Sequence, residues 1–570
     1  MQINLIEDSS VSAAPAGFMT VIAAAAQFLD KLITNPITVN ILVGWGEDDN
    51  GAYPIGSNIS LGGALAGIGA SYSQLRGDLL SNSATALGNF AFANLPTTDP
   101  TNGGTFYVSD AEAKALQLIP ANGSEIDGGV GFNATYPYNF NINGVGAPGT
   151  IDLFNDAILE LTHALGMQFG NGSDYTAMML FRYAALGGRQ LMANGFVTPA
   201  AYFSIDDGKT NLDNYATSGD STLWPTTAGN DAFAIPYSYG AGHVYSLTDA
   251  AELIAIGFNV NTAVLETNGT IYGTSANENV YAFELPNNAA FSGVGSDTII
   301  FTANRNSYTV TVNSNDSITI TNGTTTNQFE NVAFLEFADQ TFVTAGATPG
   351  VLSAFSLSQQ SELIYIGYFN RSADGGGFNF WEAQDATAQA QGQSAALALT
   401  NIANSFTPQA ETQALYPFLS NPNPNYSNPT VQAGLISFVE NVYSNLFGHA
   451  ADSGGLAYWT GQIESGAVGL GAAVLSIANG ALGADATIEQ NKLAVALDFT
   501  ALTSAANLAV NASYLAEAKA VLAAVDGVAL NDASVAAAEA TIAAWVPSQP
   551  AASVTVVGGA AAPVPHPFLA

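Results

Sequence analysis

The 570-residue chain contains no cysteine, so it can form neither a disulfide bond nor a thiolate metal site. This absence does not identify a compartment, because exported bacterial proteins often lack cysteine too. Basic residues are also scarce, since 10 Lys and Arg stand against 46 Asp and Glu for a formal net charge of −36. Phosphate contacts need Lys and Arg, so this composition argues against binding to nucleic acid or to anionic membrane surfaces.

Charged residues of either sign make up 10% of the chain, against about 25% in an ordinary soluble protein. The rest of the surface must consist of short polar and small side chains, which lose little rotamer entropy on packing. Such a surface suits a protein that packs against copies of itself. The acidic excess destabilises a compact state unless cations bind, and Asp and Asn in Gly-rich turns offer the oxygen ligands that Ca²⁺ prefers.

The sequence has neither a convincing membrane span nor an N-terminal export signal. Residues 11–29 are largely apolar, but polar residues, proline and glycine interrupt them. No basic residue precedes this run, whereas a secretory signal begins with positive charge. We therefore expect an Ala-rich helix ending near Asp30, and any export must use a signal elsewhere.

Length and shifts in composition predict a multidomain α+β protein. Residues 1–258 mix helical and strand patterns. Residues 37–43 alternate polar and apolar and predict a strand, residues 201–208 are strand-like, and Ser109 and Ser246 are predicted helix starts. Residues 259–350 predict a small all-β module. Residues 351–505 are predicted to be all-α, with Ala-rich helices over 506–546. The tail over 547–570 is expected to be loosely ordered and to hold a non-cleaved C-terminal export signal.

Residues 151–170, IDLFNDAILELTHALGMQFG, predict an amphipathic helix that runs into a glycine-marked end. Within it, Glu160, His163 and Gly166 match the zinc-helix pattern HExxHxxGxxH, in which His residues bind Zn²⁺ and the Glu is the general base. The first and third His positions hold Leu159 and Phe169, which cannot bind metal. Because a catalytic zinc site normally needs three protein ligands, zinc is not expected here.

Further segments occur in the order ITVNILVGWGE, ELTHALGM, MMLFRYAALGGR, YFSIDDGKTNLDNY, NDAF and SLTDAAELIAIGF. As a set, over residues 15–258, they resemble a family of bacterial extracellular metzincin-type metalloproteases. The resemblance implies a metzincin-like α/β domain, with a twisted sheet and a cleft beside the 151–170 helix. It carries over Glu160 as base and His163 as ligand, here vestigial. Met178 and Met179 correspond either to the metzincin Met-turn or to core filler.

Residues 259–350 contain alternating runs separated by Asn, Gly and Asp turns. They resemble the β segments that accompany calcium-binding repeats in type I secreted proteins. The repeat GGxGxDxxx itself is absent, and residues 293–297, GVGSD, are at best a fragment of it. A plain β spacer and a calcium-binding module both remain open.

An internal repeat appears at an offset of 78 residues. Residues 365–381, YIGYFNRSADGGGFNFW, align without gaps with residues 443–459, YSNLFGHAADSGGLAYW. Each copy predicts a helix, a polar Gly loop and a second helix that begins near the Trp. Asp374 and Asp452 either cap that loop or bind calcium. The region resembles a helical domain of unknown function found in bacterial type I secreted and surface-layer-associated proteins.

Several aspartates in turns are calcium candidates. They are Asp206, Asp207, Asp231, Asp297, Asp374 and Asp452.

Together these patterns predict a secreted, self-assembling cell-surface protein, such as a surface-layer or filament subunit, on a catalytically inactive protease-like scaffold stabilised by calcium. Its partners would be further copies of itself and a component of the cell envelope. Two alternatives remain open: a secreted zinc metalloprotease with atypical ligands, and a calcium-dependent adhesin.

Overall fold

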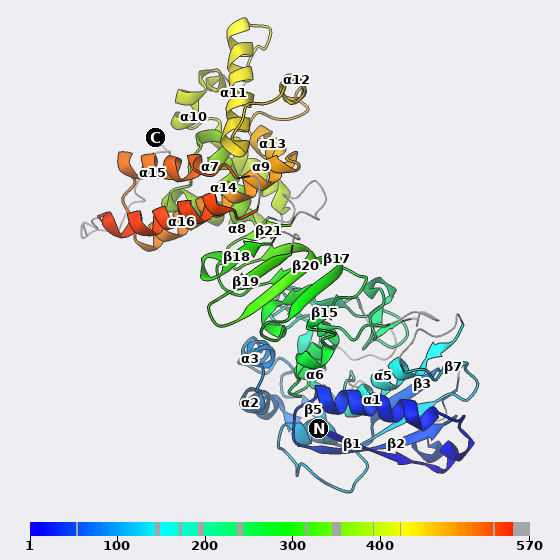
Figure 1. Ribbon diagram of the computed structural model, residues 1–570. Helices are drawn as coiled ribbons and strands as arrows, with labels where there is room; N and C mark the ends of the chain where they lie inside the picture. The colour runs from blue at the N-terminus through cyan, green and yellow to red at the C-terminus, as the bar shows by residue number, and fades with distance from the viewer. Residues whose placement is uncertain are drawn as a thin grey trace. The chain divides into compact units, whose positions relative to one another are not determined.

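The computed structural model describes residues 1–52, 55–56, 58–142, 149–169, 174–191, 199–235, 243–313, 317–344, 355–390, 393–421, 423–527 and 530–550. The chain divides into two compact units (Figure 1). The first comprises residues 1–300 and 325–332, and the second comprises 301–324 and the residues from 333 onward. Helices and strands both occur and the C-terminal region is helical, which confirms the multidomain α+β prediction.

A four-stranded sheet forms the centre of the first unit, in the order β1 (Gln2–Glu7), β2 (Thr38–Trp45), β6 (Gly128–Phe132) and β3 (Ser60–Ala64). The first three strands run parallel, and β3 is an antiparallel edge strand. Strand β2 is almost wholly buried, as expected for a central parallel strand. The alternating run predicted over residues 37–43 is therefore a strand, as expected.

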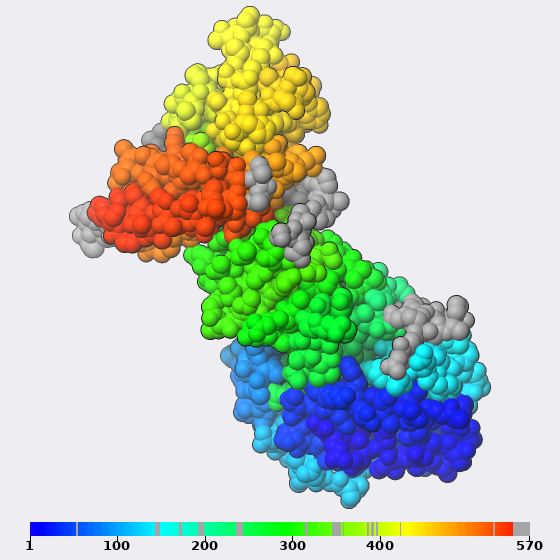
Figure 2. Space-filling view, viewed as in Figure 1, coloured from blue at the N-terminus to red at the C-terminus, as the bar shows by residue number. Residues whose placement is uncertain are grey.

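Two long helices cover this sheet: α1 (Phe18–Leu32) and α5 (Leu153–Leu165). They pack against each other, with the Phe28 and Phe154 rings 6.5 Å apart, and α1 also contacts β1. Helix α5 contacts β3 and β6. In the space-filling view the dark-blue residues 1–52 pack continuously against the lighter blue and cyan segments of the same unit (Figure 2).

Glycines in β3 and β6 let α5 approach the sheet closely. A Cβ atom on Gly62 would lie 2.3 Å from the Glu160 carbonyl oxygen, and one on Gly128 would lie 2.9 Å from the Ala164 Cβ. Both distances are shorter than any side chain tolerates. The Gly-rich sequences of these strands are thus required by the packing of α5, at a cost in strand propensity.

The remaining elements of the first unit are short. In chain order they are η1 (Ser9–Ala13), η2 (Asp49–Gly51), β4 (Gly67–Ser71), α2 (Tyr72–Asn82), α3 (Ala86–Ala93), β5 (Thr105–Ser109), α4 (Asp110–Ala115), β7 (Tyr138–Asn139), β8 (Ile151–Asp152), η3 (Ala177–Phe181), β9 (Arg182–Ala185), β10 (Gly188–Arg189), β11 (Tyr202–Phe203), β12 (Asp213–Asn214), β13 (Trp224–Pro225), η4 (Thr226–Ala228), β14 (Ala234–Ile235), α6 (Leu247–Ala255), η5 (Thr262–Leu265), β15 (Thr270–Tyr272), β16 (Asn279–Tyr281), η6 (Ala282–Glu284) and β17 (Ala290–Ile300).

Two predicted segments are shorter than expected. The helix predicted over 151–170 ends at Leu165, because Gly166 adopts a positive φ of 124°; Gly170 lies outside the described residues. The strand-like run over 201–208 forms only β11, because the chain then turns around the Asp206 side chain. The predicted starts at Ser109 and Ser246 are confirmed as capping boxes.

The β region contributes to both units. In the first, β15 and β16 both run parallel to β17. In the second, β18 (Thr309–Val312) and β19 (Ile318–Thr321) form an antiparallel pair. Strand β20 (Thr326–Glu336) has residues in both units and pairs antiparallel with β21 (Thr341–Val343).

The rest of the second unit is helical. Its elements are η7 (Arg305–Ser307), α7 (Leu357–Phe369), α8 (Gly375–Ala390), α9 (Ala395–Phe406), α10 (Ala410–Leu415), η9 (Pro417–Ser420), α11 (Pro429–Phe447), α12 (Ser453–Glu464), α13 (Ala473–Asn479), α14 (Ala484–Ala505), α15 (Ala512–Ala523), α16 (Ala533–Trp545) and η10 (Val546–Ser548). Over the described residues, no helix combines the length and apolar character needed to cross a membrane. The tail predicted to carry an export signal lies outside the described residues from 551 onward.

The two copies of the repeat contact each other at equivalent positions. Helices α7 and α11 pack together, and the Asn445 side chain donates a 2.8 Å hydrogen bond to the carbonyl of Gly367, 78 residues earlier. A Cβ atom on Gly367 would also lie 2.3 Å from Val474, which shows how closely α13 packs on α7. The repeat is therefore a duplicated helix pair that packs against its own copy.

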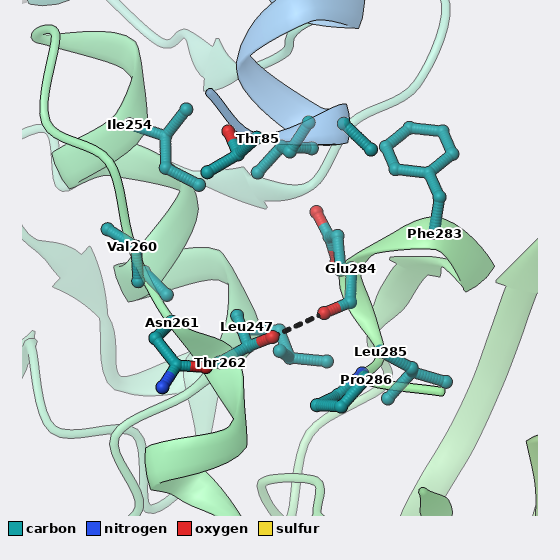
Figure 3. Close-up of a pocket in the computed structure, with 13 residues that line it drawn as sticks. Thr85, Leu247, Ile254, Val260, Asn261, Thr262, Phe283, Glu284, Leu285 and Pro286 are labelled. Atoms are coloured by element: carbon teal, nitrogen blue, oxygen red, sulfur yellow. Dashed lines mark hydrogen bonds between the residues drawn. The ribbon is translucent and has the colours of Figure 1, made fainter. Parts of the chain in front are cut away.

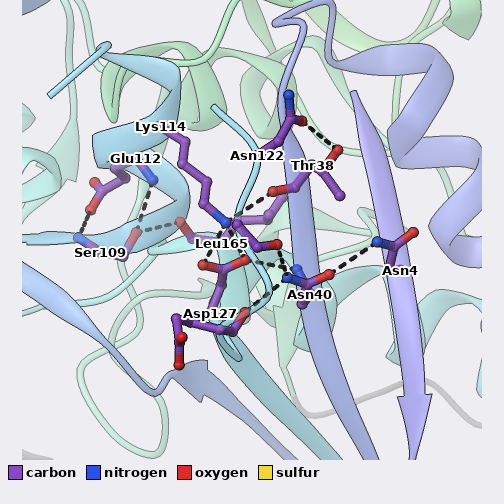
Figure 4. A network of polar contacts seen from close by, with 11 residues as sticks. Asn4, Thr38, Asn40, Ser109, Glu112, Lys114, Asn122, Asp127 and Leu165 are labelled. Carbon is purple, nitrogen blue, oxygen red and sulfur yellow. Dashed lines mark hydrogen bonds and ion pairs between the residues drawn. The ribbon is translucent and has the colours of Figure 1, made fainter. Parts of the chain in front are cut away.

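A buried ion pair joins α4 to the central sheet (Figure 4). The Lys114 ammonium lies 2.6 Å from Asp127 Oδ2 and 3.0 Å from the Thr38 carbonyl oxygen. The same Asp127 oxygen accepts a 2.7 Å hydrogen bond from the Asn40 backbone N–H. Both charged side chains are almost fully buried. This network fixes the loop before β6 against β2.

We predict that Lys114→Met lowers the free energy of unfolding of the first unit by about 3–5 kcal/mol, because it leaves the Asp127 carboxylate buried without a countercharge. Urea denaturation followed by fluorescence would measure the loss. The exposed Lys519 provides a matched control, and Lys519→Met should change stability by less than about 0.5 kcal/mol. Equal effects of the two substitutions would contradict a stabilising role for this pair.

Candidate functional site

The Glu160 and His163 side chains lie one turn apart on α5 and take part in one buried network. Glu160 Oε2 lies 3.1 Å from His163 Nδ1. The hydroxyl of Ser60, on β3, lies 2.6 Å from Glu160 Oε1 and 2.7 Å from Asp156 Oδ1. Asp156 stands one turn before Glu160, so three polar side chains of α5 share the face that meets β3. Sequence analysis did not identify Ser60 or Asp156, although the i, i+4 spacing of the two acids was visible.

The other ring nitrogen of His163 is also engaged. Nε2 lies 3.2 Å from the Thr222 hydroxyl oxygen and 3.8 Å from the Asp220 carboxylate. The Thr222 hydroxyl donates its single proton to Asp220, at 2.6 Å. With the Thr222 proton on Asp220, Nε2 is the donor to Thr222, and Nδ1 faces the Glu160 carboxylate as a donor, so this geometry favours a doubly protonated ring. An imidazole that donates from both nitrogens is a cation.

The electrostatic surroundings agree with this assignment. Burial opposes protonation of the ring, but the hydrogen bond to Glu160 and the charges of Asp220 and Glu160 outweigh it and raise the pKa of His163. A metal ligand must instead present a neutral nitrogen with a free lone pair. In this arrangement His163 serves as a countercharge for buried carboxylates.

The two positions that depart from the zinc motif are occupied by packing residues. Leu159 is buried in the hydrophobic core of the first unit. The Phe169 ring lies 5.1 Å from that of Tyr215, and the Arg182 guanidinium lies 5.3 Å from the Phe169 ring centre. Met178 is fully buried in η3 as part of the same core. These contacts are those of a packed interior.

Gly166, the third matching residue, is required by packing. A Cβ atom there would lie 2.6 Å from the Ser109 hydroxyl and 2.8 Å from Glu112 Cδ, and its φ is positive. Ser109 also donates a 2.8 Å hydrogen bond to the Leu165 carbonyl. The capping box of α4 thus also caps the end of α5 (Figure 4).

The calcium candidate Asp206 is saturated with protein donors. Its Oδ1 accepts hydrogen bonds from the Ser204 hydroxyl and the Thr210 backbone N–H, at 2.8 and 2.9 Å. Its Oδ2 accepts from the Thr210 and Tyr281 hydroxyls, at 2.8 and 2.7 Å. The carboxylate therefore holds the turn after β11 against β16.

Three further candidates are also engaged with the protein. Asp207 has a positive φ and lies 3.4 Å from the Arg189 guanidinium. Asp231 accepts a hydrogen bond from the backbone N–H of Phe233, and Asp297 accepts a 2.8 Å hydrogen bond from the backbone N–H of Glu278. Burial and the nearby charge of Asp249 raise the pKa of Asp231 well above its usual value.

Asp374 and Asp452 play the same role in the two repeats. Asp374 accepts a 2.8 Å hydrogen bond from the backbone N–H of Gly377, and Asp452 a 2.7 Å bond from that of Gly455. A Cβ atom on either glycine would lie less than 3.0 Å from a tyrosine hydroxyl of the preceding helix. Both aspartates brace the Gly loop, as one of the two sequence interpretations predicted.

Asp206 and Asp207 are neighbours in the sequence, and Asp374 and Asp452 occupy equivalent positions in the two repeats. The structure does not bring the six candidates together into one site. Within the described ranges, no three His, Asp or Glu side chains form a group that could hold a metal ion. Calcium binding, and the absence of zinc, stay predictions.

Each unit contains a cavity that sequence analysis did not anticipate. In the first unit, a cavity of about 230 Å³ lies between α3, α6 and η6 (Figure 3). In the second, a cavity of about 410 Å³ is bordered by the turn between β20 and β21 and by α7, α8 and α14, and its polar lining includes Glu336, Asp339 and Glu382.

Part of the chain matches a known protein family. Residues 427–481, which include the second copy of the repeat, match a domain of unknown function, DUF4214. No curated protein matches the chain. No solved structure matches it either.

Buried carboxyl groups outside the His163 network also shape the electrostatics. Burial raises the pKa of Glu112, Asp249 and Glu278 to about 8, and that of Glu362 to about 7. These groups hold protons in the folded state that they release on unfolding at neutral pH. Their contribution is fully present below the unfolded pKa near 4 and is lost as pH rises towards 8. The raised pKa of His163 likewise makes the folded state less stable as the pH rises.

We therefore predict that the protein is more stable at pH 5 than at pH 8, with a melting temperature several degrees higher. Differential scanning calorimetry in buffers without divalent cations would measure this. Glu362→Gln should flatten the pH dependence of the second unit, whereas the exposed Glu440→Gln should leave it unchanged. A melting temperature that rises between pH 5 and pH 8 would show that these carboxyls do not dominate.

The protonated state of His163 can be tested by comparing the free energies of unfolding of variants. His163→Leu should lower the free energy of unfolding by about 3–5 kcal/mol, because Glu160 and Asp156 would remain buried without their countercharge. His449, half exposed beside Asp485, provides the matched control, and His449→Leu should cost less than about 1 kcal/mol. If His163→Leu were neutral or stabilising, the imidazolium assignment would be wrong.

Proposed function

We propose that this protein is a secreted, non-catalytic structural protein that assembles with copies of itself at the cell surface. The observation that carries the non-catalytic part is the proton arrangement at His163. Its two nitrogens lie at hydrogen-bond distance from Glu160 and Thr222, and the doubly protonated ring that this geometry favours has no lone pair for a metal. A zinc-bound water, the nucleophile of such proteases, therefore has no support from this residue.

We further propose that the first unit is a metzincin-like scaffold that has lost its zinc chemistry. In support, Glu160, His163 and Gly166 occupy their motif positions at the C-terminal half of α5 and at its end. The antiparallel edge strand β3 lies directly against this helix. The same geometry that would place a substrate strand beside a metal here supplies Ser60 to the buried acids.

Self-assembly is supported by how the few basic residues are used. Half of the ten Lys and Arg residues are buried, namely Lys114, Arg182, Arg305, Arg371 and Lys492. The acidic surface is therefore left with very few cations of its own. Copies of such a chain repel one another until solution cations screen or bridge the carboxylates. This supports calcium as the trigger for assembly.

The helical repeats offer a matching pair of contact residues. Phe380 and Tyr458 are exposed, lie 78 residues apart at equivalent positions, and each contacts the ring of the following Trp. Exposed aromatic residues of this kind are enriched at protein interfaces.

We place the export signal in the C-terminal tail, so that the protein is extracellular.

The test combines metal analysis with electron microscopy of the purified full-length chain. We predict sheets or filaments at millimolar calcium and dispersed particles in its absence, with sodium at equal ionic strength and magnesium as controls. A Phe380→Ser, Tyr458→Ser double variant should assemble less, while the exposed Leu186→Ser, outside the repeats, should not affect assembly. Particles that stay monomeric at millimolar calcium would contradict the proposal.

The same preparation separates the alternatives. We expect no stoichiometric zinc by mass spectrometry and no peptide cleavage that differs between the parent protein and Glu160→Gln. Zinc bound at one equivalent together with cleavage lost in Glu160→Gln would establish the protease instead. Binding to a surface glycan without self-assembly would favour the adhesin.

A further inference from the structure

The cavity in the first unit is lined by apolar and polar groups in about equal measure. Leu247 and Ile254 of α6 and Val260 line one side, and the Phe283 ring and Pro286 border another (Figure 3). Its volume of about 230 Å³ is several times the roughly 30 Å³ that one water molecule takes up in the liquid. It is smaller than the 300–1,000 Å³ of sites for drug-sized ligands. A small molecule of a few carbon atoms is the right size.

One carboxyl group points into this cavity. Glu284 is only 6% exposed, and its Oε1 has no hydrogen-bond partner among the described residues. Figure 3 shows the side chain extending from η6 towards Thr85 and Ile254. The backbone beneath it is fixed, because the Thr262 hydroxyl donates a 2.7 Å hydrogen bond to the Glu284 carbonyl. The backbone at Glu284 is therefore held in place, and one oxygen of its carboxyl group has no partner among the described residues.

The charge around this carboxyl favours a cation. Burial and the nearby charge of Glu278 raise the pKa of Glu284 well above its usual value. No Lys, Arg or His is among the thirteen residues that line the cavity. A buried carboxylate without a countercharge is costly, so the group holds a proton while the cavity contains no cation. An ammonium group that enters the cavity would pair with the carboxylate as that proton is released. The face of Phe283 offers a second favourable contact for a cation.

We propose that this cavity binds a small aliphatic primary ammonium ion, with its ammonium group paired to Glu284 and its carbon chain against Leu247, Ile254 and Val260. A primary ammonium has three donors for the carboxylate and neighbouring oxygens. The side formed by Leu247, Ile254 and Val260 favours contact with a short hydrocarbon chain. This binding site is independent of the His163 network and of any assembly.

Isothermal titration calorimetry of the full-length chain with n-butylammonium chloride tests the proposal. Butylammonium should bind at least about ten-fold more tightly than the neutral, similarly shaped n-butanol, because the alcohol can donate a hydrogen bond to Glu284 but carries no positive charge to pair with it. Nα-acetyl-lysine amide presents the same group on a peptide unit. If it also binds, the site accepts lysine side chains as well as free amines.

Variants assign the binding to this cavity. Glu284→Gln keeps the side-chain shape and should weaken butylammonium binding at least about ten-fold. Glu489→Gln alters an equally buried carboxyl of the second unit and should leave binding unchanged. Ala86→Leu narrows the exposed border of the cavity without touching the carboxyl, and should also reduce binding. Equal affinity for butanol, equal affinity of Glu284→Gln, or no binding to the folded parent protein would overturn the proposal and leave a water-filled cavity.

Discussion

The close approach of α5 to the glycine-lined strands β3 and β6 is the constraint on which the first unit depends. Without side chains at Gly62 and Gly128, the helix backbone comes within reach of the sheet. At that separation the polar residues of α5 cannot reach water, so they must find partners inside the protein. Ser60 on β3 is one such partner, and its hydroxyl lies within hydrogen-bond distance of both Asp156 and Glu160.

This constraint gives the residues that match the zinc-motif pattern structural roles of their own. Once Glu160 and Asp156 are buried by the tight packing, a positive charge nearby is worth several kcal/mol. His163 supplies that charge as an imidazolium held between Glu160 and Thr222. Gly166 persists for a separate reason, because any side chain there would collide with the capping box of α4. Each matching residue of the motif thus has a structural role that needs no metal.

Local signals in the sequence predicted local structure well. The capping boxes at Ser109 and Ser246, the strand β2 and the 78-residue repeat all follow from spacing and residue type. The His163 network could not be predicted in full, because Ser60 and Thr222 come from segments about 100 and 59 residues away. Nothing in their immediate neighbourhood marks them. Glu284 was missed for the same reason, since an acid next to Leu and Pro looks like an ordinary turn residue until burial is known.

Both units of this protein bury basic side chains in their interiors. A chain with ten basic residues could spread them over its surface to offset 46 acids, yet it buries half of them. In the second unit Arg371 pairs with Glu411 at 3.0 Å and also stacks on the Tyr365 ring of the first repeat. Basic side chains that are buried in the interior cannot neutralise the carboxylates on the surface. The surface charge must then be balanced by ions from solution, so the tendency of this chain to associate should depend on which cations surround it.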